Sequence, residues 1–155
     1  MKEVYVSLIS EEDRNFLVDY FSKEMVEPVK LVYFTQHQSP LVVPSIECMY
    51  CKETGELLNE VAGLSDKITV EVHDLLKDAD LAKEYRVEKI PALIMTGKNK
   101  GKVRFFGIPS GYEFSTLIEG IKSVSQGTTD LSEGTKKELA KITAETHIQV
   151  FVTPT

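Results

Sequence analysis

The stretch Cys48-Met49-Tyr50-Cys51 holds the only two cysteines of the chain. It follows a run typical of a buried strand, Val29–Phe34, and it begins a helical pattern. Two cysteines at this spacing can close a small disulfide ring, which opens and closes during turnover in thiol–disulfide enzymes. The sequence therefore predicts a redox function centred on this stretch.

Composition limits the other classes of function. The 155 residues are 42% hydrophobic and 27% charged, which is typical of one compact globular domain. The net charge of -6 and the absence of a basic stripe argue against binding to nucleic acid or to an anionic membrane. The sequence has no apolar run of the ~20 residues that a membrane span needs, and no signal peptide is recognisable at its amino terminus. We therefore expect a cytoplasmic location, where a CxxC pair is more often catalytic or metal-binding than structural.

Hydrophobic periodicity predicts the elements around the cysteines. Ser10 caps a first helix that ends before Pro28, and a loop over 36–47 separates the first strand from a helix that begins at Cys48. The remaining elements are predicted to be strands at 68–72, 92–95 and 103–106 and helices at 48–62, 80–85 and 113–124. This order predicts an α/β fold with a mixed four-stranded sheet, helices on both faces and an extra N-terminal helix.

The last residues repeat the beginning of the chain. Ser132-Glu133 opens another helical pattern, and the strand-like run Ile148–Thr153 follows it, as Leu31–Thr35 follows the helix that Ser10-Glu11 opens. A repeat that stops after its first strand suggests an incomplete second unit. We therefore expect one complete unit at 1–126 and the first helix and strand of a truncated second unit at 127–155.

Several motifs together carry a family resemblance. They are the CxxC after a strand, the Ile90-Pro91 step before the third strand, the stretch Arg104–Phe114 and the terminal Val150–Thr155. The chain resembles the thioredoxin/glutaredoxin superfamily. More narrowly it resembles the amino-terminal unit of the tandem protein disulfide oxidoreductases, or glutaredoxin-like proteins, of thermophiles. The resemblance implies a thioredoxin fold, although the loop before Cys48 is longer than in the family and the second active site is absent.

The two cysteines are expected to have different roles. Backbone N–H groups and the helix dipole at the helix amino terminus lower the pKa of Cys48 and make it the attacking nucleophile. Cys51, one turn further, would then attack the mixed disulfide and release the product. Met49 and Tyr50 would contact the substrate and tune the redox potential of the two cysteines. A carboxylate at Glu47 would oppose the thiolate of Cys48.

Three further residues complete the predicted site. The resemblance implies a cis peptide bond before Pro91, facing the thiols, so that the backbone of Ile90 can pair with an extended substrate segment. Glu60 lies within the apolar stripe of the second helix and is a candidate proton acceptor for Cys51, with a solvated flank carboxylate as the alternative. The segment Leu41–Val43 is either an apolar lip for substrates or a cover for the core.

The expected partners follow from this chemistry. They are protein or peptide disulfide substrates and an electron donor that is either a thioredoxin-reductase-like protein or a small thiol. No cofactor and no metal is expected, because His37, His73 and His147 lack ligand spacing relative to the cysteines. The unpaired edge of the terminal strand suggests either a dimer or aggregation of the truncated form. The rival hypothesis is a redox-poor thioredoxin-like module that serves for binding or packing, with catalysis in an absent second unit.

Overall fold

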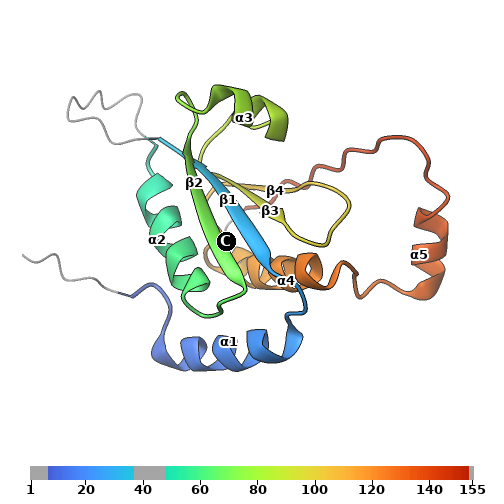
Figure 1. Cartoon of the computed structure of the whole chain (residues 1–155), viewed down its shortest axis with the longest axis horizontal. Coiled ribbons are helices and arrows are strands. Elements are labelled where there is room, and N and C mark those ends of the chain that lie inside the picture. Colours follow the sequence, from blue (N-terminus) through green and yellow to red (C-terminus); the bar gives the residue numbers. More distant parts are fainter. Residues whose placement is uncertain (1–6, 37–47, 154–155) are drawn as a thin grey trace, which may run out of the picture.

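The structure is a computed structural model that describes residues 7–36 and 48–153 (Figure 1). Helices and strands alternate through most of the chain. In order they are α1 (Glu11–Glu24), β1 (Val29–Thr35), α2 (Cys51–Ala62), β2 (Ile68–Asp74), α3 (Ala79–Tyr85), β3 (Ala92–Thr96), β4 (Val103–Phe106), α4 (Tyr112–Gln126) and α5 (Glu133–Leu139). In this part of the chain no helix has both the length and the apolar character needed to cross a bilayer.

The four strands form one mixed sheet in the order β2-β1-β3-β4. β1 runs parallel to β2 and antiparallel to β3, and β3 pairs antiparallel with β4. The pairing aligns Phe34 with His73 on one side and with Ala92 on the other. The predicted mixed four-stranded sheet is confirmed, and β1, which leads to the cysteines, is one of its two inner strands.

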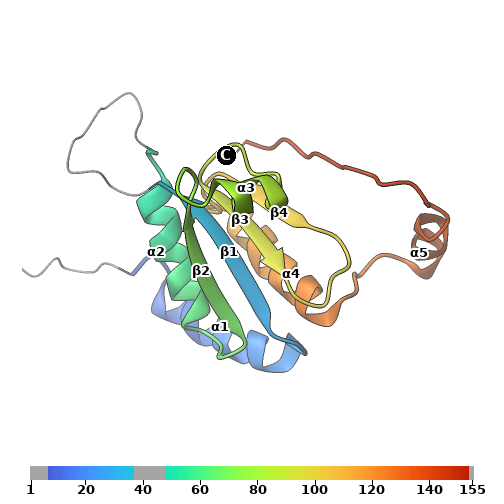
Figure 2. The ribbon, with the colours of Figure 1, turned by 45° about the horizontal axis from the view of Figure 1, so that its top comes forward.

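The apolar residues of β1 explain its central position. Val29, Leu31 and Tyr33 are buried in a core cluster with residues of α1, α2 and α4, whereas Val32 and Phe34 are buried in a second cluster with residues of α3. A strand that is apolar on both faces needs cover on both faces. Figure 2 shows this arrangement, with α3 and α4 on opposite sides of the sheet. The prediction of helices on both faces is therefore confirmed.

The N-terminal helix is anchored by a cap and by contacts with α4. The backbone N–H of Asp13 donates to Ser10 Oγ at 3.1 Å, which is an N-cap of the predicted kind. The inner face of α1 contributes Leu17 and Phe21 to the larger core cluster. On its outer side Tyr20 donates a 2.6 Å hydrogen bond to Glu119 of α4.

Two predicted elements differ from the structure. α2 begins at Cys51 instead of Cys48, so that Cys48 precedes the helix. Residues 148–153 form no strand, and Ile148, Val150 and Phe151 are exposed to 79%, 79% and 89%. The prediction of a strand there is wrong for this structure, because the described sheet consists of β2, β1, β3 and β4 and residues 148–153 join none of its ladders.

The C-terminal region buries almost nothing. α5 contributes no buried residue and stands away from the sheet in both views (Figures 1 and 2). α4 ends at Gln126, and Gly127 follows with φ +68°, a conformation that favours glycine. This end of α4 lies at the predicted boundary between the two units, and the division itself stays a prediction.

Candidate redox site

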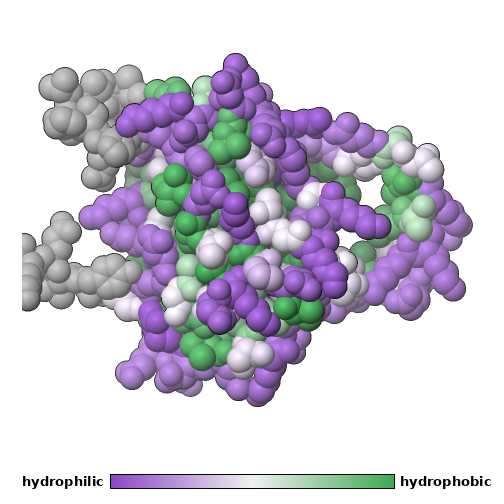
Figure 3. Space-filling model, viewed as in Figure 1, coloured by the Kyte–Doolittle hydropathy of each residue, from purple (hydrophilic) through white to green (hydrophobic). Residues whose placement is uncertain are grey.

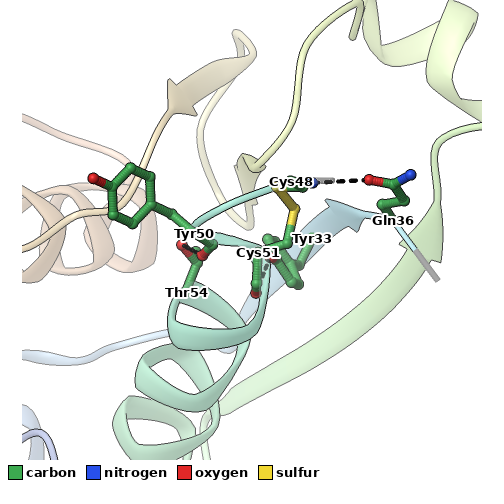
Figure 4. The surroundings of a disulfide bond; sticks show 6 residues. All are labelled: Tyr33, Gln36, Cys48, Tyr50, Cys51 and Thr54. Carbon is green, nitrogen blue, oxygen red and sulfur yellow. Dashed lines mark hydrogen bonds between the residues drawn. A yellow bond between two sulfur atoms is a disulfide. The ribbon is translucent and has the colours of Figure 1, made fainter. Parts of the chain in front are cut away.

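Cys48 and Cys51 are joined by a disulfide bond between the end of β1 and the start of α2 (Figure 4). Their Cα atoms are 5.4 Å apart. The side chains differ in exposure, because Cys48 is half-buried whereas Cys51 is buried at 5% exposure. Cys48 is therefore the less buried residue of the pair, and the order of attack stays a prediction.

The N-cap residue of α2 does not cap the helix with its own side chain. Tyr50 occupies the N-cap position and makes no capping hydrogen bond with its side chain. Its carbonyl oxygen accepts from the N–H of Thr54 at 3.0 Å and from Thr54 Oγ1 at 2.7 Å. A helix amino terminus carries partial positive charge and stabilises a nearby anion, such as a thiolate.

Two residues at and just beyond the end of β1 each make a hydrogen bond to the backbone of one cysteine. Gln36, which follows β1, accepts with Oε1 from the backbone N–H of Cys48 at 2.9 Å. Tyr33 of β1 donates its hydroxyl to the carbonyl oxygen of Cys51 at 2.6 Å, and Figure 4 shows this contact. Both cysteines are thus held by the segment in which β1 ends.

Sequence reasoning treats Tyr33 only as a strand residue and misses this contact. The side chain is 2% exposed, and its burial raises the pKa of the phenol, an effect that the nearby Thr35 and Thr54 side chains partly oppose. The hydroxyl is therefore a protonated donor at neutral pH. A signal was present in the sequence, because a buried tyrosine in a strand that is apolar on both faces needs a hydrogen-bond partner.

Glu60 is buried at 5% exposure, so the alternative of a solvated flank carboxylate is wrong, and the side chain contacts another part of the molecule. Its carboxylate accepts from Ser7 Oγ at 2.8 Å and from the backbone N–H groups of Leu8 and Ile9 at 2.8 and 3.1 Å, and Arg14 lies 3.8 Å away. The nine residues from Cys51 to Glu60 in α2 correspond to about 13 Å along the helix axis. This placement argues against Glu60 as the proton acceptor for Cys51 and indicates an anchor for the N-terminal segment.

The predicted substrate-contacting residues lie at or near the same edge of the sheet. The Ile90–Pro91 peptide bond is cis, as the resemblance implies. Phe34, near the end of β1, pairs with Ala92, the first residue of β3. Pro91 directly precedes Ala92, so it lies at the same end of the sheet as the end of β1, after which the cysteines follow. Pro91 is buried and Ile90 is half-buried, whereas Met49 and Tyr50 are exposed to 78% and 47%. Their roles in binding stay predictions.

The described histidines have ordinary hydrogen-bond partners. His73 lies between Glu71 and Asp78, at 3.0 and 3.3 Å, and His147 contacts Arg104 at 3.1 Å. In residues 7–36 and 48–153 no three His, Cys, Asp or Glu side chains form a group that could hold a metal ion. His37, Glu47 and the segment Leu41–Val43 lie outside the described residues.

Comparison with known proteins places this site in a family. A probable thioredoxin of Methanothermobacter thermautotrophicus is 37% identical over 78 residues, which are 50% of this chain and 87% of that protein.

Two solved structures share the fold over most of the chain. A protein disulfide oxidoreductase from Aeropyrum pernix is 27% identical over 88% of this chain, with a TM-score of 0.71. The alkylhydroperoxide reductase AhpF of Enterococcus faecalis is 26% identical over 86% of this chain, with a TM-score of 0.69. The match spans only 56% and 60% of those two chains. Residues 41–119 match the thioredoxin domain family, and the chain belongs to this family.

Proposed function

We propose that this chain is a protein-disulfide oxidoreductase that exchanges disulfides with protein, peptide or small dithiol substrates through Cys48 and Cys51. The observation that carries the proposal is the disulfide between a half-buried and a buried cysteine at the start of α2. Membership of the thioredoxin family supports the general chemistry. The similarity to the Aeropyrum pernix oxidoreductase supports the narrower assignment.

The proposed reaction begins with the dithiol form of the protein. The Cys48 thiolate attacks one sulfur of the substrate disulfide, and the other substrate sulfur leaves as a thiolate and takes a proton. The thiol of Cys51 then loses its proton, and its sulfur attacks Cys48 Sγ, which releases the second substrate thiol. The protein loses two electrons and the substrate gains two.

A thiol reductant restores the dithiol form. We propose either a thioredoxin-reductase-like protein or a small thiol as this electron donor, and no resident cofactor enters the scheme. The same steps in reverse would oxidise a substrate dithiol. The supply of reductant or oxidant therefore decides the direction of net reaction.

Substrate contacts are assigned to the residues around the disulfide. The exposed side chains of Met49 and Tyr50 would pack against the substrate on the helix side. On the sheet side, the backbone of Ile90 would pair with an extended substrate segment beside Pro91, in the manner of strand addition. This arrangement favours unfolded or flexible protein segments as substrates.

Substitution of each cysteine tests the assignment. Reduction of insulin with dithiothreitol as electron donor should proceed with the wild type and fall to the uncatalysed rate with Cys48→Ser. With Cys51→Ser the mixed disulfide on Cys48 should accumulate, because the resolving sulfur is missing. Mass spectrometry detects this adduct. Equal rates with the wild type and Cys48→Ser would rule out the enzyme function.

A redox-poor binding or packing module is the rival function. The chain spans only 56% of the Aeropyrum pernix protein, so the activity of that whole protein is itself only a proposal for this chain. Under this alternative the chain would bind unfolded proteins with unchanged affinity when Cys48 is replaced. Binding measurements with the wild type and Cys48→Ser, made alongside the insulin assay, separate the two functions.

We also propose a setting for the chain. A cytoplasmic location fits its composition, and residues 127–155 would begin a second thioredoxin-like unit. The exposed apolar residues at 148–152 would support a dimer through this terminal segment.

A further inference from the structure

We propose that Tyr33 is a positioning residue of the Cys48–Cys51 couple and that its hydroxyl stabilises the disulfide form relative to the dithiol form. This inference rests on the proposed function, since it concerns the equilibrium that the exchange reaction uses. Tyr33 does not react itself, and it acts through the backbone of Cys51.

The contact is buried and directed at the first turn of α2. Tyr33 Oη donates to the carbonyl oxygen of Cys51 at 2.6 Å, and the side chain is 2% exposed. In Figure 4 the Tyr33 side chain lies next to Cys51, at the start of the helix. Water cannot readily replace a donor at this depth, so removal of the hydroxyl leaves the carbonyl oxygen without this partner.

The Tyr33 ring lies directly against Gly55 of α2. A Cβ atom on Gly55 would meet Tyr33 Cε1 at 3.4 Å, which is ordinary van der Waals contact. The ring therefore packs directly under the first two turns of α2, which restricts the position of the hydroxyl.

Gln36 supplies the companion restraint. Because Gln36 Oε1 accepts from the backbone N–H of Cys48, a residue of β1 and the residue that follows β1 hold the two ends of the CxxC stretch. The disulfide also holds the two residues together, but it is absent from the dithiol form. Loss of the Tyr33 hydrogen bond therefore adds more conformational freedom to the CxxC stretch in the dithiol form than in the disulfide form. Formation of the Cys48–Cys51 disulfide then becomes less favourable.

The equilibrium with glutathione measures this difference. In the reaction, one protein disulfide and two glutathione molecules give one protein dithiol and one glutathione disulfide, with transfer of two electrons. For Tyr33→Phe in the full chain we expect about a threefold to tenfold shift toward the dithiol, as the loss of one hydrogen bond allows. A tenfold shift equals about 30 mV in reduction potential. Alkylation of free thiols and mass spectrometry give the two populations.

Tyr20→Phe is a matched control. Tyr20 also donates its hydroxyl over 2.6 Å, but to Glu119 on the outer side of α1 and α4. Its removal should leave the glutathione equilibrium unchanged. The free energies of unfolding of the oxidised and reduced forms provide a second measurement, and Tyr33→Phe should destabilise the oxidised form more than the reduced form.

The outcomes separate this inference from the proposed function. If Tyr33→Phe destabilises both redox forms equally and leaves the glutathione equilibrium unchanged, Tyr33 has only a structural role and the inference is overturned. If the wild-type disulfide does not exchange with glutathione or any dithiol, the proposed function fails first. A shift with Tyr33→Phe and none with Tyr20→Phe supports the inference.

Discussion

At the scale of single residues, buried polar groups tie distant parts of the chain to α2. Glu60 binds Ser7, Leu8 and Ile9, and Tyr33 binds Cys51. Each buried group is satisfied, as required when a polar atom is removed from water. The carboxylate of Glu60 thereby fixes the segment that leads into α1.

Replacement of the Glu60 carboxylate should destabilise the fold. We expect Glu60→Gln to lower the free energy of unfolding by about 2–4 kcal/mol, because an amide cannot accept all the hydrogen bonds and its NH₂ group faces N–H donors. Urea unfolding of the wild type and the variant measures the difference. Glu56→Gln is the control, since Glu56 is on the same helix, is partly exposed and lies 3.9 Å from Lys52.

For the Glu56→Gln control we expect the free energy of unfolding to fall by less than about 0.5 kcal/mol, as for other surface ion pairs. A loss of insulin reduction in Glu60→Gln at unchanged stability would contradict the anchoring role and revive the role of proton acceptor.

Sequence reasoning succeeds here where the signal is local. The spacing of Cys48 and Cys51 predicts the disulfide that the structure contains, because its formation depends on residues a single turn apart. The partners of Tyr33 and Glu60 are set by tertiary packing between segments distant in the sequence. Periodicity predicts that Glu60 lies on the inner face, but it gives no information about which donors lie there.

At the scale of elements, α1 and α4 are joined by a charged cluster. Glu119 accepts from Tyr20, and Lys122 contacts both Glu119 at 2.8 Å and Asp130 at 3.0 Å. Hydrogen bonds from Lys122 and then Tyr20 lower the pKa of Glu119 below its ordinary value of 4.5. Hydrogen bonds to Glu119 and then Asp130 raise the pKa of Lys122.

This cluster predicts an acid dependence of stability. A carboxylate whose pKa is lower in the folded state stabilises the fold above pH 4.5, and this contribution disappears as the pH falls through the folded pKa. Glu119→Gln should therefore be less stable than the wild type at pH 6, and the difference should shrink below pH 4.5. Thermal unfolding across this range measures it. The exposed Glu88→Gln serves as the control, and a difference that is constant with pH would contradict the ionic role of Glu119.

The elements themselves follow largely from the sequence, with two informative exceptions. Strands such as Val29–Thr35 carry apolar residues for both faces, so local pattern and tertiary packing agree. The start of α2 moves to Cys51 because residues 48–50 form a turn. The run Ile148–Thr153 has strand propensity, yet a strand needs a partner, and β propensity depends on that context.

At the scale of the whole molecule, the sheet and its covering helices are complete without the C-terminal region. The contacts of that region with the rest are at the surface, as in the pairs Arg86–Glu145 and Arg104–His147. In the view of Figure 1, Figure 3 shows a mostly polar surface with apolar areas between. Such surface contacts contribute little to stability.

Removal of residues 131–155 should therefore leave the fold intact. Asp130 is kept, because it contacts Lys122. We expect the free energy of unfolding to change by less than about 1 kcal/mol, since the deleted part buries little apolar surface. Urea unfolding and circular dichroism check this. A collapse of the fold would show that the C-terminal region belongs to the first unit.

The same truncation tests self-association. The exposed Ile148, Val150 and Phe151 give the full chain an apolar segment without cover among the described residues. Sedimentation velocity should show concentration-dependent dimers for the full chain and monomers for the truncated chain. Phe151→Ser should weaken the dimer, whereas Leu76→Ser, at another exposed apolar position, should not.

Tyr33, which is hydrogen-bonded to Cys51, also gives the protein an intrinsic fluorescence signal. The chain has no tryptophan, so emission from its six tyrosines is not lost by energy transfer to an indole. A disulfide close to a phenol quenches its fluorescence, and Tyr33 binds the residue that carries one of the two sulfurs. Opening of the disulfide should therefore increase the tyrosine fluorescence of the protein without any added dye. This increase should be smaller in Tyr33→Phe, and the difference between the two proteins is the signal of the buried Tyr33.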